Sequence, residues 1–217
     1  MIRAAFAALL SLSIAGAACG KKKDDMPAGP KIEAPFSDDF ERVVLGDSYH
    51  PTAENYHIKD GALSAKGAYN HPLWLRMRLP DDVSIEFDCW SGSPDGDIKV
   101  EFFGDGRSHA THKGAYKATG YVAVMGGWSN SKSILAKRDE HGKELSQRTA
   151  PKVEVGKRYH WKITRKGGAV SWYVDDMNTP FLSYQDSAPL SGKGHEYFGI
   201  NNWESDSWFD NLRIAPL

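Results

Sequence analysis

The chain has 217 residues, of which 41% are hydrophobic and 25% charged, and its 27 basic side chains nearly balance its 28 acidic ones. This composition is typical of a soluble globular protein and excludes a disordered or fibrous one. A formal net charge of −1 gives no electrostatic reason to bind nucleic acid, so we expect no nucleic-acid partner. Seven Trp and only two Cys are the features that need explaining.

The first 18 residues predict an export signal. Arg3 precedes an apolar run over residues 4–18, which is too short to span a bilayer comfortably. The run ends in Gly16-Ala17-Ala18-Cys19 and resembles a bacterial lipoprotein signal, which is cleaved before an acylated Cys. We therefore expect a lipid on Cys19 that anchors the chain to a membrane of the bacterial cell envelope, facing the periplasm or the exterior. A plain secretory signal with an incidental Cys is the alternative.

The rest of the chain divides into a linker and one domain. Residues 19–35 are charged, contain Pro and almost lack large apolar side chains, which predicts a flexible linker after the acylated Cys. Residues 36–217 show no second boundary and no repeat, so we expect one domain.

Short alternating or apolar runs, separated by Gly, Pro, Asn and Asp, recur along this domain and predict strands. The predicted strands are 36–41, 56–59, 62–65, 73–79, 83–90, 98–103, 120–126, 133–138, 153–155, 159–165, 169–174, 181–185, 197–201 and 207–214. So many strands in one domain predict an all-β, two-sheet sandwich.

Several segments together resemble a known family. They are Phe36-Ser-Asp-Asp-Phe-Glu, Ile58-Lys-Asp-Gly-Ala-Leu, Trp161-Lys-Ile-Thr-Arg followed by Trp172-Tyr-Val-Asp-Asp, and Trp208-Phe-Asp-Asn-Leu-Arg-Ile. In this order they resemble the concanavalin A-like lectin and glucanase superfamily, which includes laminin-G-like modules, family 16 glycoside hydrolases and 3-keto-disaccharide hydrolase domains. The resemblance implies an antiparallel jelly-roll sandwich over residues 36–217 and a carbohydrate-related role, although fold alone does not establish function.

Alternation along two strands predicts which side chains leave the core. Ile85, Phe87 and Cys89 share one face, so we expect Cys89, the only thiol outside the anchor, to be a small core residue with no disulfide. The opposite faces of strands 83–90 and 98–103 carry Glu86, Asp88, Trp90, Lys99 and Glu101. If the two strands are neighbours, this surface offers carboxylates and Lys to sugar hydroxyls and a flat ring to sugar C–H groups. A solvated face with cross-strand ion pairs is the alternative.

Three polar segments rich in Asn, His, Glu and Trp extend the predicted site: 69–74, 126–131, and 195–197 together with 201–205. Because Trp161 and Trp172 alternate with apolar neighbours, we expect both in the core, whereas Trp208 is unassigned. The predicted ligand-binding residues are His71, Trp74, Trp90, Lys99, Glu101, Trp128, Asn130, Asn202, Trp203 and Glu204.

An enzymatic alternative starts from the family 16 pattern Glu-x-Asp-x-x-Glu. Glu86 and Asp88 match its first two positions, but Ser91 stands at the third. A retaining glycosidase needs a second carboxyl group about 5–5.5 Å from the nucleophile, which Glu101 on a neighbouring strand could supply. A sugar-cleaving enzyme of this fold would therefore use Glu86, Asp88 and Glu101.

A structural Ca²⁺ is a further expectation. Asp210 is in phase with Leu212 and Ile214, which would place a carboxylate on the inward face, where it needs compensation. The resemblance implies Ca²⁺ held by such an Asp with oxygens near Asp39 and Gly61. A hydrogen-bonded Asp that closes a turn is the alternative.

The sequence thus predicts a monomeric surface lipoprotein that binds a glycan or oligosaccharide through a jelly-roll groove. The alternatives are a glycoside hydrolase or related enzyme of the same fold, and an adhesion or structural module without a small ligand.

Overall fold

The computed structural model describes residues 28–142 and 145–217. The predicted signal peptide, Cys19 and the first part of the linker lie outside the described residues. Within them, no helix is long and apolar enough to cross a membrane.

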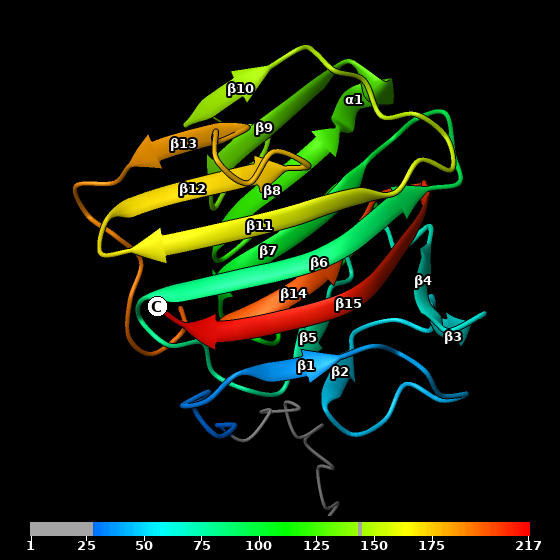
Figure 1. Cartoon of the computed structure of the whole chain (residues 1–217). Helices are drawn as coiled ribbons and strands as arrows, with labels where there is room; N and C mark the ends of the chain where they lie inside the picture. The colour runs from blue at the N-terminus through cyan, green and yellow to red at the C-terminus, as the bar shows by residue number, and fades with distance from the viewer. Residues whose placement is uncertain (1–27, 143–144) are drawn as a thin grey trace, which may run out of the picture.

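Two antiparallel sheets pack face to face (Figure 1). The eight-stranded sheet has the spatial order β13 (Leu182–Gln185), β12 (Ala169–Val174), β11 (Tyr159–Lys166), β6 (Val83–Ser91), β15 (Asp206–Pro216), β4 (Ala62–Lys66) and β3 (Tyr56–Lys59), with β1 (Phe36–Asp38) also paired to β15. The seven-stranded sheet has the order β10 (Ser146–Arg148), β9 (Lys132–Lys137), β8 (Tyr121–Gly126), β7 (Ile98–Gly104), β14 (Tyr197–Asn201), β5 (Leu73–Leu75) and β2 (Tyr49–Pro51). The predicted all-β, two-sheet antiparallel sandwich is confirmed.

The core lies between the sheets, as strand alternation requires. Phe87 of β6 contacts Trp161 and Phe209 in its own sheet and Phe198 across the sandwich, with ring centroids 5.4, 5.9 and 6.2 Å away, respectively. Trp161 and Trp172 are fully buried, and so is Cys89, whose thiol pKa is raised by burial. All three core predictions are confirmed.

The boundary predicted at residue 36 is wrong. Ile32 is buried in the core, and its N–H donates to the carbonyl of Arg78. At Gly29, a Cβ atom would lie 1.7 Å from the Arg76 carbonyl oxygen. These residues therefore pack as part of the domain, because one apolar side chain and its backbone pairing outweigh the polar composition around them.

Three further strand predictions need correction. The short strands β2 and β10 carry no alternation long enough to identify them, and the sequence missed both. Residues 153–155 form only an isolated bridge rather than a strand.

The outer face of the seven-stranded sheet is partly covered by the long connection 105–120 between β7 and β8. Tyr116 and Ala118 of this connection pack on Val122 and Val124 of β8, and thereby form a second, smaller apolar cluster. The outer face of the eight-stranded sheet has no comparable cluster of buried apolar residues among those described. A pocket on the outer face of the seven-stranded sheet can therefore form only beside the connection 105–120.

Candidate functional site

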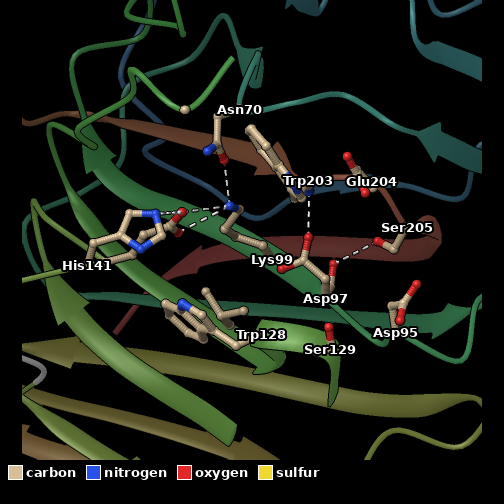
Figure 2. A pocket seen from close by; sticks show the side chains of 13 residues that line it. Asn70, Asp95, Asp97, Lys99, Trp128, Ser129, His141, Trp203, Glu204 and Ser205 are labelled. Carbon is tan, nitrogen blue, oxygen red and sulfur yellow. Dashed lines mark hydrogen bonds and ion pairs between the residues drawn. The ribbon is translucent and has the colours of Figure 1, made fainter. Parts of the chain in front are cut away.

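A cavity of about 440 Å³ lies on the uncovered part of the outer face of the seven-stranded sheet (Figure 2). Lys99 of β7 and Val124 of β8 contribute from the sheet itself. The remaining lining comes from connections: Asn70, Asp95, Asp97, Gly114, Trp128, Ser129, Glu140, His141, Trp203, Glu204 and Ser205. A concave site that joins aromatic rings to a few fixed polar groups is the usual form of a small-ligand site.

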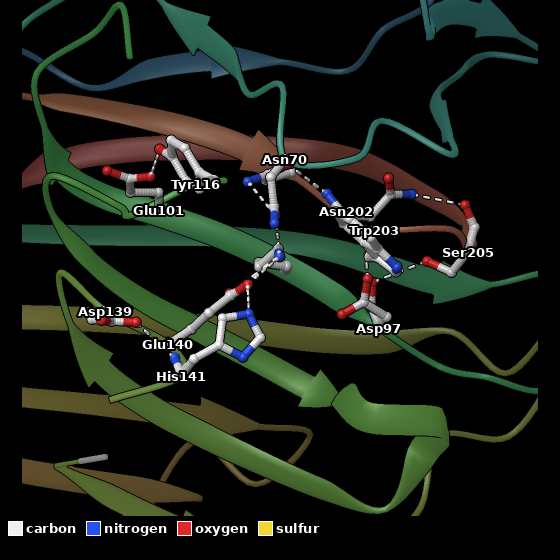
Figure 3. A network of polar contacts seen from close by, with 12 residues as sticks. Asn70, Asp97, Glu101, Tyr116, Asp139, Glu140, His141, Asn202, Trp203 and Ser205 are labelled. Carbon is white, nitrogen blue, oxygen red and sulfur yellow. Dashed lines mark hydrogen bonds and ion pairs between the residues drawn. The ribbon is translucent and has the colours of Figure 1, made fainter. Parts of the chain in front are cut away.

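A buried ion pair lies deepest in the cavity. The Lys99 ammonium donates to both carboxylate oxygens of Glu140 at 3.1 Å and to Asn70 Oδ1 at 2.5 Å (Figure 3). Burial lowers the pKa of Lys99, but the negative charges of Glu140 and Asp97 outweigh burial and hold that pKa above its ordinary value. Lys99 therefore stays charged, and all three of its N–H donors are used.

Trp128 forms one wall of the cavity on an unusual turn. It belongs to α1 (Gly127–Asn130), a single turn in which Trp128, Ser129 and Asn130 have φ of 52°, 55° and 59°. The left-handed conformation costs about 1–2 kcal/mol for each non-glycine residue, and a bulky side chain rarely adopts it. The turn leaves Trp128 with 37% of its surface exposed. Strained backbone that presents an exposed aromatic ring is a feature of functional sites.

Asn130 holds that turn in place. Its Nδ2 donates to the carbonyls of Val153 and Pro94 at 2.8 and 3.1 Å, and its Oδ1 accepts the Val153 N–H at 2.9 Å. Asn130 is buried and does not line the cavity. It therefore positions Trp128 rather than contacting a ligand.

Trp203, between β14 and β15, forms the opposite wall. Its backbone N–H donates to Asp97 Oδ2, and its ring meets the Tyr69 ring edge-on at 5.2 Å. Lys113 at the tip of the covering connection forms an ion pair with Glu204 at 2.8 Å, beside these rings. Burial raises the pKa of Asp97, although the charge of Lys99 opposes the shift.

Asn202 ties two of the connections together. Its Oδ1 accepts the Ala68 N–H at 2.8 Å, and its Nδ2 donates to the carbonyl of Ala65 at 2.7 Å. Its own carbonyl accepts the Asn70 N–H at 3.0 Å, so both Asn70 and Trp203 are fixed relative to the sheet (Figure 3). Asn202 is fully buried and has a positioning role.

Four of the predicted ligand-binding residues line this cavity: Lys99, Trp128, Trp203 and Glu204. Trp74 is fully buried, since its ring lies over Gly104 and Gly199 and its Nε1 donates to the Ser108 carbonyl of the covering connection. The prediction of Trp74 as a surface ring is therefore wrong.

Glu101 and His71 also lie outside the cavity lining. Glu101 accepts hydrogen bonds from the Tyr116 hydroxyl and from the N–H groups of Thr119 and Gly120, and so fastens the covering connection to β7. Burial raises the pKa of Glu101 to about 7. His71 stacks on His109 at 5.3 Å beside the cavity.

The prediction that strands 83–90 and 98–103 are neighbours is wrong. They are β6 and β7, which belong to different sheets. Glu86 and Asp88 therefore lie on the opposite side of the sandwich from Glu101, and these three carboxylates cannot act together on one sugar. The connection 92–97 carries the chain from one sheet to the other, which alternation within each strand cannot reveal.

Trp90 also lies on the far side of the sandwich, in a row of side chains in which two aromatic rings lie between two cations. Its ring is parallel to that of Trp208, its cross-strand partner, at a centroid distance of 5.7 Å. Arg158, just before the neighbouring strand β11, stands 4.3 Å from the Trp90 ring centre, and Lys59 of β3 stands 5.8 Å from that of Trp208. The strand order puts Trp208 and Arg158 on opposite faces of Trp90, so neither face is free to stack on a sugar.

The predicted calcium ligands do not fit a Ca²⁺ ion. A register shift in β15, with Asn211 at φ 52°, lets Phe209 and Leu212 both face the core and turns Asp210 outward. Asp210 there forms an ion pair with Arg158, which supplies its compensation. Within the described ranges, no group of three or more His, Cys, Asp or Glu could hold a metal, and the exposed Asp39 carboxylate accepts the Glu41 N–H.

Nine of the thirteen lining residues are absent from the predicted set, among them the polar residues Asn70, Asp97, Glu140 and His141. Glu140 and His141 follow β9 in a polar loop and show no pattern of their own. Asp97 lies between two predicted strands, and Asn70 lies in one of the predicted polar segments. Asn and Asp tolerate the left-handed turn conformation that both residues adopt, but no single strand contains enough of the site to reveal it.

Part of the sequence matches the profile of a known family. The profile of a family described as "Farnesoic acid 0-methyl transferase" matches residues 108–212, just under half of the chain. No curated protein matches the sequence. The chain is similar to that family over those residues.

Comparison with solved structures shows the fold. Carbohydrate binding module CBM66 from Bacillus subtilis has a TM-score of 0.59 at 18% identity, over 79% of this chain and 98% of that one. A Bacillus subtilis protein of unknown function with a galectin-like fold has a TM-score of 0.63 at 13% identity, over 85% and 97%. The Ca²⁺/Man2-bound VIP36 exoplasmic/lumenal domain has a TM-score of 0.59 at 10% identity, over 85% and 88%. The fold is therefore the predicted concanavalin A-like jelly roll.

Proposed function

We propose that the domain binds a glycan in the cavity between Trp128 and Trp203. The observation that carries the proposal is the strained turn of α1, which exposes the Trp128 ring beside the buried, hydrogen-bonded cluster of Asn70, Lys99 and Glu140. The likeness in fold to a carbohydrate binding module and to the Ca²⁺/Man2-bound VIP36 domain supports the same function.

In this proposal the aromatic and the polar lining residues contact different parts of the sugar. The face of the Trp128 ring opposite Lys132 stacks on the apolar C–H face of a sugar, and the Trp203 ring bounds the same space from the other side. The side chains of Asn70, Glu140 and Asp97 accept or donate hydrogen bonds at the hydroxyl edge. Because their partners already fix them, little side-chain entropy is lost when the sugar binds.

A glycan array with the purified chain tests the proposal. We expect specific binding to at least one class of oligosaccharide, and we expect Trp128→Ala to weaken it about 30-fold or more, as for a stacking residue at the centre of a site. Trp90→Ala on the far side of the sandwich is the matched control and should leave affinity within about twofold. Binding lost equally in both variants, or no binding to any glycan, would contradict the proposal.

The same array separates the alternatives. Cleavage of a bound oligosaccharide that depends on a cavity carboxylate such as Glu140 would identify an enzyme. Neither binding nor cleavage would favour an adhesion or structural module without a small ligand.

We also propose that the domain is held at a membrane of the cell envelope by a lipid on Cys19. Support comes from the sequence Gly16-Ala17-Ala18-Cys19 after an apolar run. Radiolabelled palmitate should label the wild-type chain in a bacterial host and not the Cys19→Ser variant. Equal labelling of the two would contradict the anchor.

A further inference from the structure

The cavity carries more negative than positive charge. Its ionisable lining residues are Asp95, Asp97, Glu140, Glu204, Lys99 and His141. Glu140 is paired with Lys99, and Glu204 is paired with Lys113 at the rim. Neither Asp95 nor Asp97 forms an ion pair with any described residue. Within the described ranges, neither carboxylate therefore accepts a hydrogen bond from a cation, although the nearby charge of Lys99 acts on Asp97.

Asp97 is the better placed of these two carboxylates. Its Oδ2 accepts the Trp203 N–H, and its carbonyl accepts the Ser205 hydroxyl, so both its backbone and its side chain are fixed. Figure 2 shows its carboxylate between Lys99 and Trp203. Lys99 does not neutralise it directly, because its three N–H donors go to Asn70 and Glu140.

Asp97 is half-buried, and a carboxylate withdrawn from water without an ion pair of its own is costly, so a bound cation would relieve that cost. The raised pKa of Asp97, caused by its burial, agrees with this. Removal of the remaining water by a ligand would strengthen the attraction between Asp97 and a positive group.

The aromatic walls favour cations as well. Lys132 Nζ stands 4.4 Å from the centre of the Trp128 ring. Lys113 Nζ stands 5.0 Å from the Tyr69 ring centre and 5.6 Å from that of Trp203. The protein thus already places ammonium groups against both walls, and the negative ring faces attract such groups.

We propose that the cavity selects an amino sugar with a free ammonium group, whose charge is held by Asp97 while its ring stacks on Trp128. This inference rests on the proposed glycan-binding function and specifies its ligand class. The ammonium donates a charge-assisted hydrogen bond to the free oxygen of Asp97. Acidic sugars are disfavoured, because Asp95 and Asp97 repel a carboxylate.

Isothermal titration calorimetry with three matched oligosaccharides tests the inference. All three are β-1,4-linked glucose-type oligomers of equal length, and they differ at C2, which carries an ammonium, an acetamido or a hydroxyl group. We expect the ammonium form to bind at least tenfold tighter than the other two at pH 6. Asp97→Asn, which keeps an oxygen acceptor for the Trp203 N–H, should reduce this preference to threefold or less.

A charge-matched control separates this site from general attraction between a cationic oligomer and an acidic protein. Asp60 is exposed in the turn between β3 and β4. Its φ of 52° is close to the 55° of Asp97, and Asn tolerates that backbone conformation at both positions. Asp60→Asn should therefore keep the full preference. Equal weakening in the two variants would overturn the inference.

The inference and the proposed function can fail separately. Binding of the acetamido or hydroxyl form as tightly as the ammonium form overturns the inference, and so does binding of none of the three. If Trp128-dependent binding to another array glycan persists, the glycan-binding function stands. Thermal melting of each variant checks that it is folded.

Discussion

The two outer faces of the sandwich carry similar charged residues, but in the described part of the chain only the face of the seven-stranded sheet is covered by another segment. On the seven-stranded sheet, Lys99 and Glu101 are almost completely buried, because the connection 105–120 and the surrounding turns enclose them. On the eight-stranded sheet, Glu86 and Lys162 sit across neighbouring strands at 4.0 Å and are each about one third exposed.

Burial changes how much an ion pair contributes to the stability of the fold. An exposed ion pair contributes little to stability, because water and salt screen it, whereas a buried pair is strongly coupled to the fold. Backbone strain does not follow this division, since positive φ occurs at Asp60 and Asn211 of the eight-stranded sheet as well as around the cavity. The cavity differs in that four of its lining residues share this conformation: Asn70, Asp97, Trp128 and Ser129. Such clustering is typical of functional sites.

The largest expected effect on stability comes from replacing Lys99 on the covered face, and replacing Lys162 on the other face is its matched comparison. Lys99→Met leaves Glu140 buried without its partner and should lower the free energy of unfolding by about 3–5 kcal/mol. Lys162→Met removes the exposed pair with Glu86 and should cost about 0–1 kcal/mol. Urea unfolding of both variants measures the difference. Equal losses would show that the two faces are not distinguished by burial.

A second effect is the pH dependence contributed by Glu101. Its pKa of about 7 in the folded protein lies above the ordinary 4.5, so the folded state holds a proton that the unfolded chain has released. The stabilisation is complete below pH 4.5 and is lost as the pH rises through 7, by about 2 kcal/mol between pH 5 and pH 7. Glu101→Gln should remove that slope from urea unfolding curves measured at several pH values.

Asp88 on the other face should contribute a pH dependence of stability with the opposite sign, so that its contribution is lost as the pH falls. Burial raises its pKa, but hydrogen bonds from His160 and Asn211 outweigh burial and lower it. Its stabilising contribution is therefore present above pH 3.8 and lost as the pH falls further. Asp88→Asn should reduce the loss of stability at acid pH and leave the slope between pH 5 and pH 7 unchanged. The same sign in both variants would contradict this contrast.

The smallest expected effect is that of a chelator. Asp210 on the eight-stranded sheet is compensated by Arg158, so EGTA should leave the melting temperature unchanged. The Arg158→Ala variant provides the contrast, because it leaves Asp210 without that partner and should melt at a lower temperature with or without EGTA. A melting temperature lowered by EGTA in the wild-type chain would contradict the assignment of Arg158 as the compensating charge.

Local pattern predicted most of the fold. Alternation identified β3, β12 and β14 with the bounds that the structure has, and it placed Cys89, Trp161 and Trp172 in the core. It failed at β15, where a single bulge reverses the phase of Asp210, and at Ile32, whose burial depends on contacts with residues about 46 positions away. The alternation also assigned Lys99 and Glu101 to a face that points away from the core, and the polar segment 69–74 suggested an exposed Trp74. Neither pattern contains information on what covers those side chains.

Strand alternation and turn residues were sufficient to predict the two-sheet sandwich, the core side chains and the candidate rings Trp128 and Trp203, because these patterns act over a few neighbours. The packed sheets were needed to show that β6 and β7 belong to different sheets, and that Asn70, Asp97 and Glu140 meet around Lys99. The two kinds of information differ in the range of the interactions that produce them. A strand's pattern records which side faces the core, whereas a cavity is formed by connections that are distant in sequence and are brought together only when the sheets pair.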